Sequence, residues 1–180
     1  MPHCGQPRFQ SKKEALAIPM IFCESEPGNT LNLKIENHLN IMVNYWLAKQ
    51  EPSGPRGYNV LQLKKDKKTV WDGVHNNLAL KHIRNMKKND LVFFYHTGDE
   101  RQVVGIMTVT SEPYPNPEED NERFVVVNVK FKNLLKNPVT LDQIKKQKQF
   151  KNWELLRISR LSVMPVPKSL WDLIIKMSKK

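Results

Sequence analysis

The stretch NYWLAKQEP, residues 44–52, decides the fold that we expect for this chain. Two aromatic residues and a leucine favour a half-buried β-strand. The same strand then presents Lys49 and Glu51 and is stopped by Pro52, which has no backbone N–H to donate to a neighbouring strand. An otherwise apolar strand therefore carries a hydrogen-bond donor and an acceptor at its end.

Further runs rich in β-branched or aromatic residues extend this pattern along the chain. The predicted strands are residues 43–48, 91–96, 103–110, 124–131 and 158–163. Apolar residues at helical spacing predict helices at residues 76–87, 140–148 and 167–178, the second capped by Thr140. Strands and long helices do not alternate regularly, which argues against a doubly wound parallel sheet. We expect an α+β fold with a compact, curved, mostly antiparallel sheet that closes on itself and carries helices outside.

Residues 1–41 show neither helical nor strand periodicity and are interrupted by several prolines. We interpret them as a poorly ordered leader that precedes a single domain at residues 42–180. Because Met42 stands just before the first strand, a second hypothesis is that translation starts there.

The composition excludes several classes of protein. No run of about 18 apolar residues is present, which argues against a membrane-spanning helix. The chain has only two cysteines, Cys4 and Cys23, without the spacing of a zinc site or a disulfide framework. With no secretory signal in view, we expect an intracellular protein, cytoplasmic in a prokaryote or nuclear in a eukaryote. We expect no metal and no cofactor.

The charge is strongly asymmetric. The chain carries a net charge of +11, and residues 1–41 contain four basic and four acidic residues, so the whole surplus follows residue 41. Such a surface attracts polyanions, since Lys and Arg side chains that neutralise phosphates release counterions. A lysine-rich surface that only maintains solubility remains an equal alternative from charge alone.

Three segments could carry a binding site. In TVWDGVHNN, residues 69–77, Trp71 precedes a tight turn and the start of a basic helix, where Asn76 could offer an amide to a base edge; the alternative is that Trp71 fills the core. Tyr95 and His96 end the strand at residues 91–96, where they could stack on a flat heterocycle. Alternation in the strand at residues 158–163 places Arg160 and Ser162 on one face.

Eight short motifs together resemble the EVE domain family, in the family's order and spacing. They are YWLAKQEP, TVWDGVHN, DLVFFYH, VVGIMTV, a Tyr114–Pro115 pair, VVVNVKF, PVTL and SRLSVMPV. The similarity covers about residues 43–177. Family members usually have Arg and Ser at the positions of His75 and Gln50.

The resemblance implies a PUA-like fold, a small closed β-barrel decorated by helices, with a pocket that accepts a nucleobase. Modified bases such as 5-methylcytosine, 5-hydroxymethylcytosine or 6-methyladenine are the implied ligands. The residues expected in the base pocket are Trp46, Lys49, Glu51, Trp71, Val74, Asn76, Tyr95, His96, Arg160 and Ser162. Phosphates of the flanking strand are expected on the basic helix, at Lys81, Arg84, Lys87 and Lys88.

The resemblance also explains the charged end of the first strand. If that end lies at the mouth of a barrel, Lys49 and Glu51 offer both senses of hydrogen bonding to an extruded base. Leaving such groups buried without partners would cost about 2 to 7 kcal/mol, so a polar planar occupant is favoured. The leading hypothesis is a non-catalytic, monomeric reader of a modified base in DNA or RNA.

Two other functions remain open. The first is an RNA-association module linked to tRNA or rRNA, since PUA-like barrels often bind RNA. The second is an enzyme that acts on a flipped base with Glu51 or His96 as general base. The sequence has no paired carboxylates, metal-ligand cluster or nucleophile motif that favours the enzyme.

Overall fold

The computed structural model describes residues 43–180. The predicted leader at residues 1–41 and the alternative start at Met42 lie outside the described residues. None of the helices that the structure describes has the length and apolar character to cross a bilayer. Within residues 43–180, no group of three or more His, Cys, Asp or Glu side chains could hold a metal ion.

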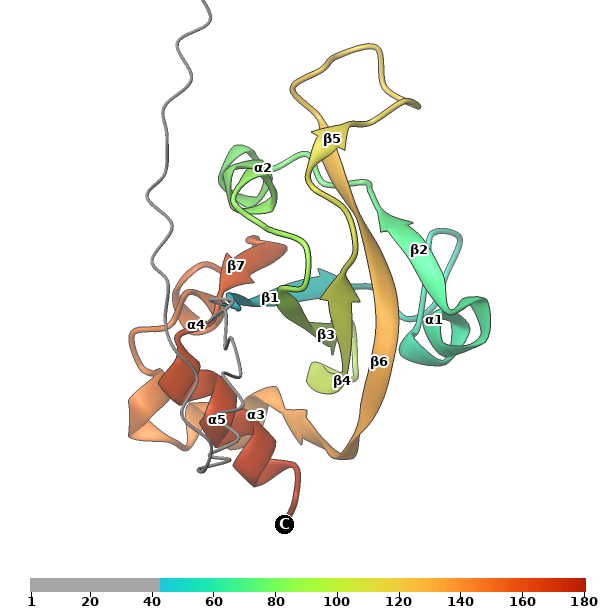
Figure 1. Ribbon diagram of the computed structural model, residues 1–180. Helices are drawn as coiled ribbons and strands as arrows, with labels where there is room; N and C mark the ends of the chain where they lie inside the picture. Colours follow the sequence, from blue (N-terminus) through green and yellow to red (C-terminus); the bar gives the residue numbers. More distant parts are fainter. Residues whose placement is uncertain (1–42) are drawn as a thin grey trace, which may run out of the picture. The chain divides into compact units, whose positions relative to one another are not determined.

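The described chain forms a mixed sheet with short helices (Figure 1). The elements in order are β1 (Tyr45–Gln50), α1 (Val60–Asp66), β2 (Lys68–Trp71), α2 (Asn77–Arg84), β3 (Leu91–His96), β4 (Gln102–Val109), β5 (Tyr114–Pro115), β6 (Val125–Thr140), α3 (Leu141–Lys145), the 3₁₀ segment η1 (Lys148–Phe150), α4 (Glu154–Arg157), β7 (Val163–Pro165) and α5 (Lys168–Met177).

The sheet is curled, and its strand order is β2-β6-β4-β3-β1-β7, with β5 paired to β6. Only β1 and β3 run parallel; the other pairs are antiparallel. The expected mostly antiparallel curved sheet, with helices outside, is confirmed (Figure 1). The two ends of the strand order, β2 and β7, are not hydrogen-bonded to each other, so the ladder forms a half-barrel with an open seam.

Most of the predicted elements are present with shifted bounds. The first strand continues through Lys49 and Gln50, and β6 is far longer than the run predicted from residue 124 to 131. The expected cap of α3 is confirmed, because the Thr140 side chain accepts from the N–H of Gln143 while the Gln143 side chain accepts from the N–H of Thr140.

One predicted strand is wrong. Residues 158–162 form a turn, closed by the Leu161 N–H donating to the carbonyl of Ile158 at 3.1 Å, and β7 begins only at Val163. The apolar alternation of Leu161 and Val163 reflects two anchors at the end of a turn, both fully buried.

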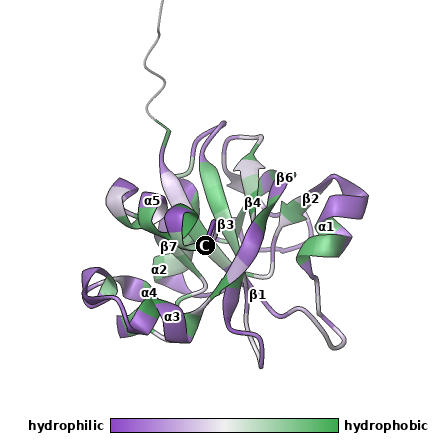
Figure 2. Cartoon of the chain, turned by 90° about the horizontal axis from the view of Figure 1, so that it is seen from below, coloured by the Kyte–Doolittle hydropathy of each residue, from purple (hydrophilic) through white to green (hydrophobic). Residues whose placement is uncertain are grey.

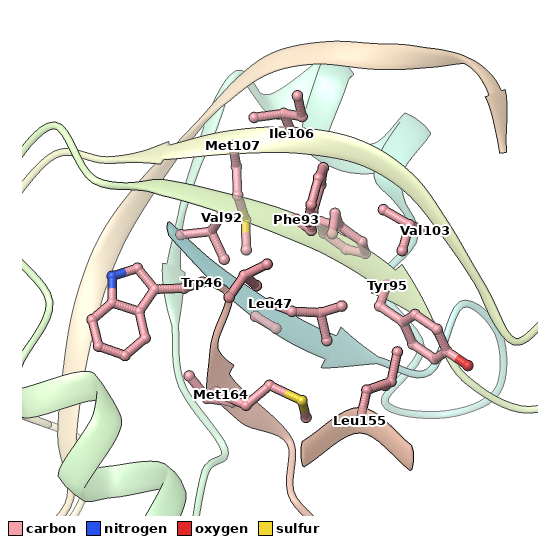
Figure 3. Close-up of a cluster of buried hydrophobic side chains, with 14 of the residues drawn as sticks. Trp46, Leu47, Val92, Phe93, Tyr95, Val103, Ile106, Met107, Leu155 and Met164 are labelled. Atoms are coloured by element: carbon pink, nitrogen blue, oxygen red, sulfur yellow. The ribbon is translucent and has the colours of Figure 1, made fainter. Parts of the chain in front are cut away.

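Both faces of the sheet are buried: Leu47 lies opposite Phe93 on one face, and Met107 lies opposite Val92 on the other (Figure 3). The ring of Phe93 stacks on Trp171 of α5 with centroids 3.7 Å apart. This contact fixes α5 against the sheet.

Candidate functional site

The largest polar cavity lies at the open seam of the half-barrel. It has a volume of about 510 Å³, within the range of small-molecule sites. Its walls come from the end of β1, from the turn after β2 and from the turn before β7, so it lies where the two ends of the sheet approach each other. We call it the seam cavity; its lining residues are Lys49, Gln50, Glu51, Arg56, Asp72, Gly73, Thr97, Ser159, Arg160, Leu161 and Ser162.

Lys49 places a half-buried ammonium group in this cavity. Its Nζ atom donates to the carbonyl of Ser159 at 3.0 Å, and its backbone N–H donates to the carbonyl of Ser162 at 2.8 Å. Burial lowers the pKa of Lys49 below the usual value, because the charged form loses hydration. A ligand that accepts a hydrogen bond from Nζ would compensate for that loss.

Glu51 follows β1 and brings a carboxylate to the same cavity. Its Oε2 atom accepts from the Thr97 hydroxyl at 2.7 Å, which fixes the carboxylate beside the turn after β3. Gly98 stands next to it in the left-handed region, with φ of 61°. Glu51 thus offers an acceptor to a ligand amine or imine.

Arg160 and Ser162 both line the seam cavity, as the sequence predicted, although for a different reason. The prediction relied on strand alternation, whereas the structure brings both residues to the cavity through the turn that precedes β7. A guanidinium and a hydroxyl therefore face the same space as Lys49 and Glu51.

A smaller cavity of about 270 Å³ adjoins the seam cavity and shares Gln50, Arg56 and Asp72 with it. Trp71 lines this smaller cavity, but its side chain is only 6% exposed and packs edge-on against Phe94 with centroids 5.4 Å apart. Trp71 is therefore mainly a core residue, and only a small part of its surface lines the smaller cavity. It does not line the seam cavity.

Asn76 and Val74 lie close to the seam cavity in sequence but not in its lining. The Asn76 side chain accepts from the N–H groups of Leu78 and Ala79, at 2.9 and 3.1 Å, and so caps α2. Val74 is half-buried and packs against the core. The oxygen of Asn76 is thus committed to the helix, and only its amide nitrogen remains for a ligand.

Trp46, Tyr95 and His96 do not line the seam cavity. The Trp46 indole donates to Oδ2 of buried Asp90 at 2.8 Å. Tyr95 points among apolar side chains that include Leu155 (Figure 3), and burial raises its pKa to about 12. The sequence could not show these partners, which lie far along the chain.

His96 has both ring nitrogens engaged. The Val60 N–H donates to Nε2 at 3.1 Å, so Nδ1 carries the proton and donates to Glu100 at 2.7 Å. The ring is buried and borders a separate apolar cavity. It holds α1 to the end of β3 rather than facing the seam cavity.

The basic residues expected to hold phosphates lie on α2 and in the turn after it. Lys81, Arg84, Lys87 and Lys88 are all exposed. Arg84 donates to the carbonyl of Arg123, which ties α2 to the start of β6. The three lysines have no carboxylate within ion-pair distance among the described residues.

The family is decided by the match of the EVE domain model to residues 44–177. The chain belongs to the EVE domain family. Thymocyte nuclear protein 1 from rat is 30% identical over 167 residues, which cover 76% of this chain and 74% of that protein. The human protein is 29% identical over 188 residues, with coverage of 87% and 83%.

Solved EVE domain structures agree with the fold. A Rhodopseudomonas palustris protein superposes with a TM-score of 0.71 and 36% identity, covering 76% of this chain and 94% of that one. Human thymocyte nuclear protein 1 in complex with DNA containing 5-methylcytosine gives a TM-score of 0.71 and 28% identity, covering 76% and 98%. The expected EVE-type, PUA-like architecture is thus confirmed.

Sequence reasoning did not place seven of the lining residues in the pocket of this EVE domain: Gln50, Arg56, Asp72, Gly73, Thr97, Ser159 and Leu161. Arg56 lies in a loop that folds back on β1, where the Gln50 side chain donates to the Arg56 carbonyl at 3.0 Å. The proline and glycine residues around it are typical of a turn. They did not signal that the turn returns to the strand end.

Proposed function

We propose that this EVE domain binds nucleic acid and accepts a modified base, extruded from its strand, in the seam cavity. The observation that carries the proposal is the convergence of Lys49, Glu51 and Arg160 on one cavity of about 510 Å³. Such a cavity offers cationic donors together with the carboxylate acceptors of Glu51 and Asp72. A nucleobase has both donors and acceptors along one edge, so it matches this arrangement.

The family relative supports the choice of ligand. Human thymocyte nuclear protein 1 has been solved with DNA that contains 5-methylcytosine. The exocyclic amine of cytosine would donate a hydrogen bond to the Glu51 carboxylate. The ring nitrogen and carbonyl acceptors of cytosine would accept hydrogen bonds from Lys49 or Arg160. Methylated cytosine is therefore the first base to test, followed by 5-hydroxymethylcytosine and 6-methyladenine.

Phosphates of the strand that flanks the extruded base would bind the exposed basic residues of α2 and its following turn, Lys81, Arg84, Lys87 and Lys88. Extruding a base from a duplex costs a few kcal/mol, and base stacking on an aromatic side chain returns about 1 to 3 kcal/mol. Because Trp71 is almost fully buried, the stacking return is small here. We therefore expect single-stranded or already unpaired sites to bind more tightly than intact duplex.

The proposed activity is binding without chemistry. The two ring nitrogens of His96 are both committed, which leaves no free imidazole for proton transfer in the seam cavity. Glu51 is held by Thr97 and lies on the cavity rim, where it serves as a hydrogen-bond acceptor.

The test is a titration of labelled oligonucleotides, DNA and RNA, that differ only in one central base. We expect the protein to prefer at least one modified base over its unmodified counterpart. Arg160→Gln should reduce that preference, whereas Arg157→Gln removes the same charge from exposed Arg157 on α4, outside the cavity, and should leave the preference intact. Equal affinity for all bases would refute the pocket. Stronger binding to RNA without any base preference would favour an RNA-association module instead.

A further inference from the structure

A second basic surface lies on the opposite edge of the seam, on strands β2 and β6. Lys68 and Lys130 are directly opposite each other in the antiparallel register of these strands. Side chains at opposite positions project from the same face, with Cβ atoms about 4.5 to 5.5 Å apart. Lys132 is exposed two residues further along β6, between Phe131 and Asn133, where the pairing of β6 with β4 shifts register. We call these three residues the lysine face.

The lysine face has no acidic neighbour to neutralise it. Lys68, Lys130 and Lys132 are all exposed, and none has a carboxylate within 4.0 Å among the described residues. From residue 123 to residue 141 the chain contains no aspartate or glutamate. Figure 2 shows hydrophilic residues along β6 beside α1 and β2.

Asp66, two residues before Lys68 in the sequence, is already engaged. Its two oxygens accept from the Tyr58 hydroxyl at 2.9 Å and from the Gln62 amide at 2.8 Å. Around it the sequence KKDKK adds three more lysines at positions 64, 65 and 67. Like charges directly opposite each other in a sheet are unfavourable unless an anion lies between them.

The lysine face is continuous with the cavities. Lys68 immediately precedes Thr69, and Thr69, Val70 and Trp71 line the smaller cavity, which shares residues with the seam cavity. At about 3.3 Å per residue, Lys68 lies about 10 Å along β2 from Trp71. A strand whose base enters the seam cavity can therefore pass its backbone across β2 onto β6.

We propose that Lys68, Lys130 and Lys132 form a second phosphate-binding surface, which receives the nucleic-acid backbone on the side of the cavity away from α2. This inference rests on the proposed function in one respect, that the polyanion is a nucleic acid. It does not depend on which base is recognised. The backbone then contacts the protein on both sides of the extruded base, at α2 and at the lysine face.

The test compares two double variants of equal charge. Lys68→Gln with Lys130→Gln removes two charges from the lysine face, and Lys176→Gln with Lys179→Gln removes two exposed charges from the end of α5 and the residues after it. Affinity for labelled single-stranded oligonucleotides is measured between 50 and 200 mM salt. We expect the first variant to bind about tenfold more weakly at low salt, with the slope of log K against log salt reduced by about 1 to 2. The control variant should behave like the wild type.

Modified and unmodified oligonucleotides separate this inference from the proposed function. Loss of affinity that is equal for both kinds of oligonucleotide supports the lysine face, even if no base preference exists. Unchanged affinity of the lysine-face variant with an intact base preference would overturn the lysine face and leave the pocket standing. If neither double variant differs from the wild type, the lysine face is refuted. If both double variants weaken binding equally, the effect is that of net charge and the lysine face is likewise refuted.

Folding and membrane binding are controlled in the same experiment. Removing the charges of the two facing lysines relieves repulsion, so the thermal unfolding midpoint of the lysine-face variant should equal or exceed that of the wild type. Lys132→Gln alone provides a milder variant, with an expected slope change of about 1. Sedimentation with phosphatidylserine vesicles tests the other phosphate source: reduced vesicle binding with unchanged oligonucleotide affinity would overturn the assignment to nucleic acid.

Discussion

A β-carbon on Gly98 would lie 2.6 Å from Oε1 of Glu51. The turn after β3 therefore has room for the Glu51 carboxylate only because residue 98 has no side chain. The same glycine adopts φ of 61°, a left-handed conformation that other residues adopt with strain. Together with the hydrogen bond from Thr97, this space determines where the Glu51 carboxylate points in the seam cavity.

The first prediction concerns that space. Gly98→Ala should displace the Glu51 carboxylate, and we expect it to weaken binding of the preferred oligonucleotide about as much as Glu51→Ala does. Gly54→Ala is a matched control, because Gly54 has φ of 88° but no atom within 4 Å of the added carbon. Both alanine variants should lose about 1 kcal/mol of folding stability from backbone strain. If Gly54→Ala weakens binding as much as Gly98→Ala, strain and not the position of Glu51 explains the effect.

The second prediction concerns the affinity at alkaline pH. Burial lowers the pKa of Lys49, and a ligand acceptor on Nζ favours the charged form. Affinity should therefore be highest below the pKa of free Lys49 and fall as pH rises through it. Lys49→Arg, which stays charged, should lose less affinity between pH 7 and pH 10 than the wild type. Parallel pH profiles of the two proteins would show that Lys49 does not contact the ligand.

The same lysine makes a prediction about folding. The pKa of Lys49 is lower in the folded state than its ordinary value of 10.5. At pH values between these two pKa values, the folded protein therefore binds fewer protons at Lys49 than the unfolded protein does. The free energy of unfolding should therefore rise with pH in that window. Denaturant unfolding of wild type and Lys49→Met should show a difference that shrinks as pH rises. A constant difference would mean that burial does not penalise the charge.

The sequence predicted the site best where polarity interrupts an apolar strand. Lys49 and Glu51 were found because a buried strand has no local reason to end on charged residues, and both line the seam cavity. Arg160 and Ser162 were found with a wrong local structure, since a turn and an edge strand can both show alternating polarity.

Sequence reasoning failed where long-range packing decides exposure. Tyr95 was expected in the pocket because an aromatic residue at a strand end can stack on a base, and Trp46 was expected there from the resemblance to the EVE domain family. The Trp46 indole instead reaches Asp90, which lies 44 residues later, and Tyr95 is covered by apolar side chains that include Leu155. No local pattern reveals a partner at such a distance.

Substitution of Trp71 distinguishes a role in core packing from a role in stacking on a base. Its side chain is 6% exposed and contacts Phe94, so Trp71→Ala should lower the free energy of unfolding by about 3 to 5 kcal/mol. Val70→Ala, at the neighbouring position with a 40% exposed side chain, should change it by less than about 0.5 kcal/mol. A Trp71→Ala protein of nearly wild-type stability that has lost base preference would reassign Trp71 to ligand stacking.

His96 should affect stability and not binding. His96→Phe keeps an aromatic ring but leaves the buried N–H of Val60 without an acceptor, at a cost of about 1 to 3 kcal/mol of folding stability.

The hydrogen bond from His96 lowers the pKa of Glu100, so the folded state gains stability above pH 4.5 that is lost as pH falls through the lowered pKa. The difference in stability between wild type and Glu100→Gln should accordingly shrink in acid. A variant of His96 that folds normally but no longer binds oligonucleotides would place the histidine in the site after all.

The lysines that follow α2 should contribute to the binding of every oligonucleotide, whereas the seam cavity should distinguish one base from another. Lys87→Gln with Lys88→Gln removes two exposed charges without touching the backbone bonds from residues 87 and 88 to Asp90 and Glu112. Binding should weaken by a similar factor for every oligonucleotide, with a salt slope reduced by about 1 to 2. Fluorescence titrations with modified and unmodified strands measure both quantities. A loss confined to the modified strand would mean that these lysines act on the base and not on the phosphates, because a phosphate contact is blind to the base that it flanks.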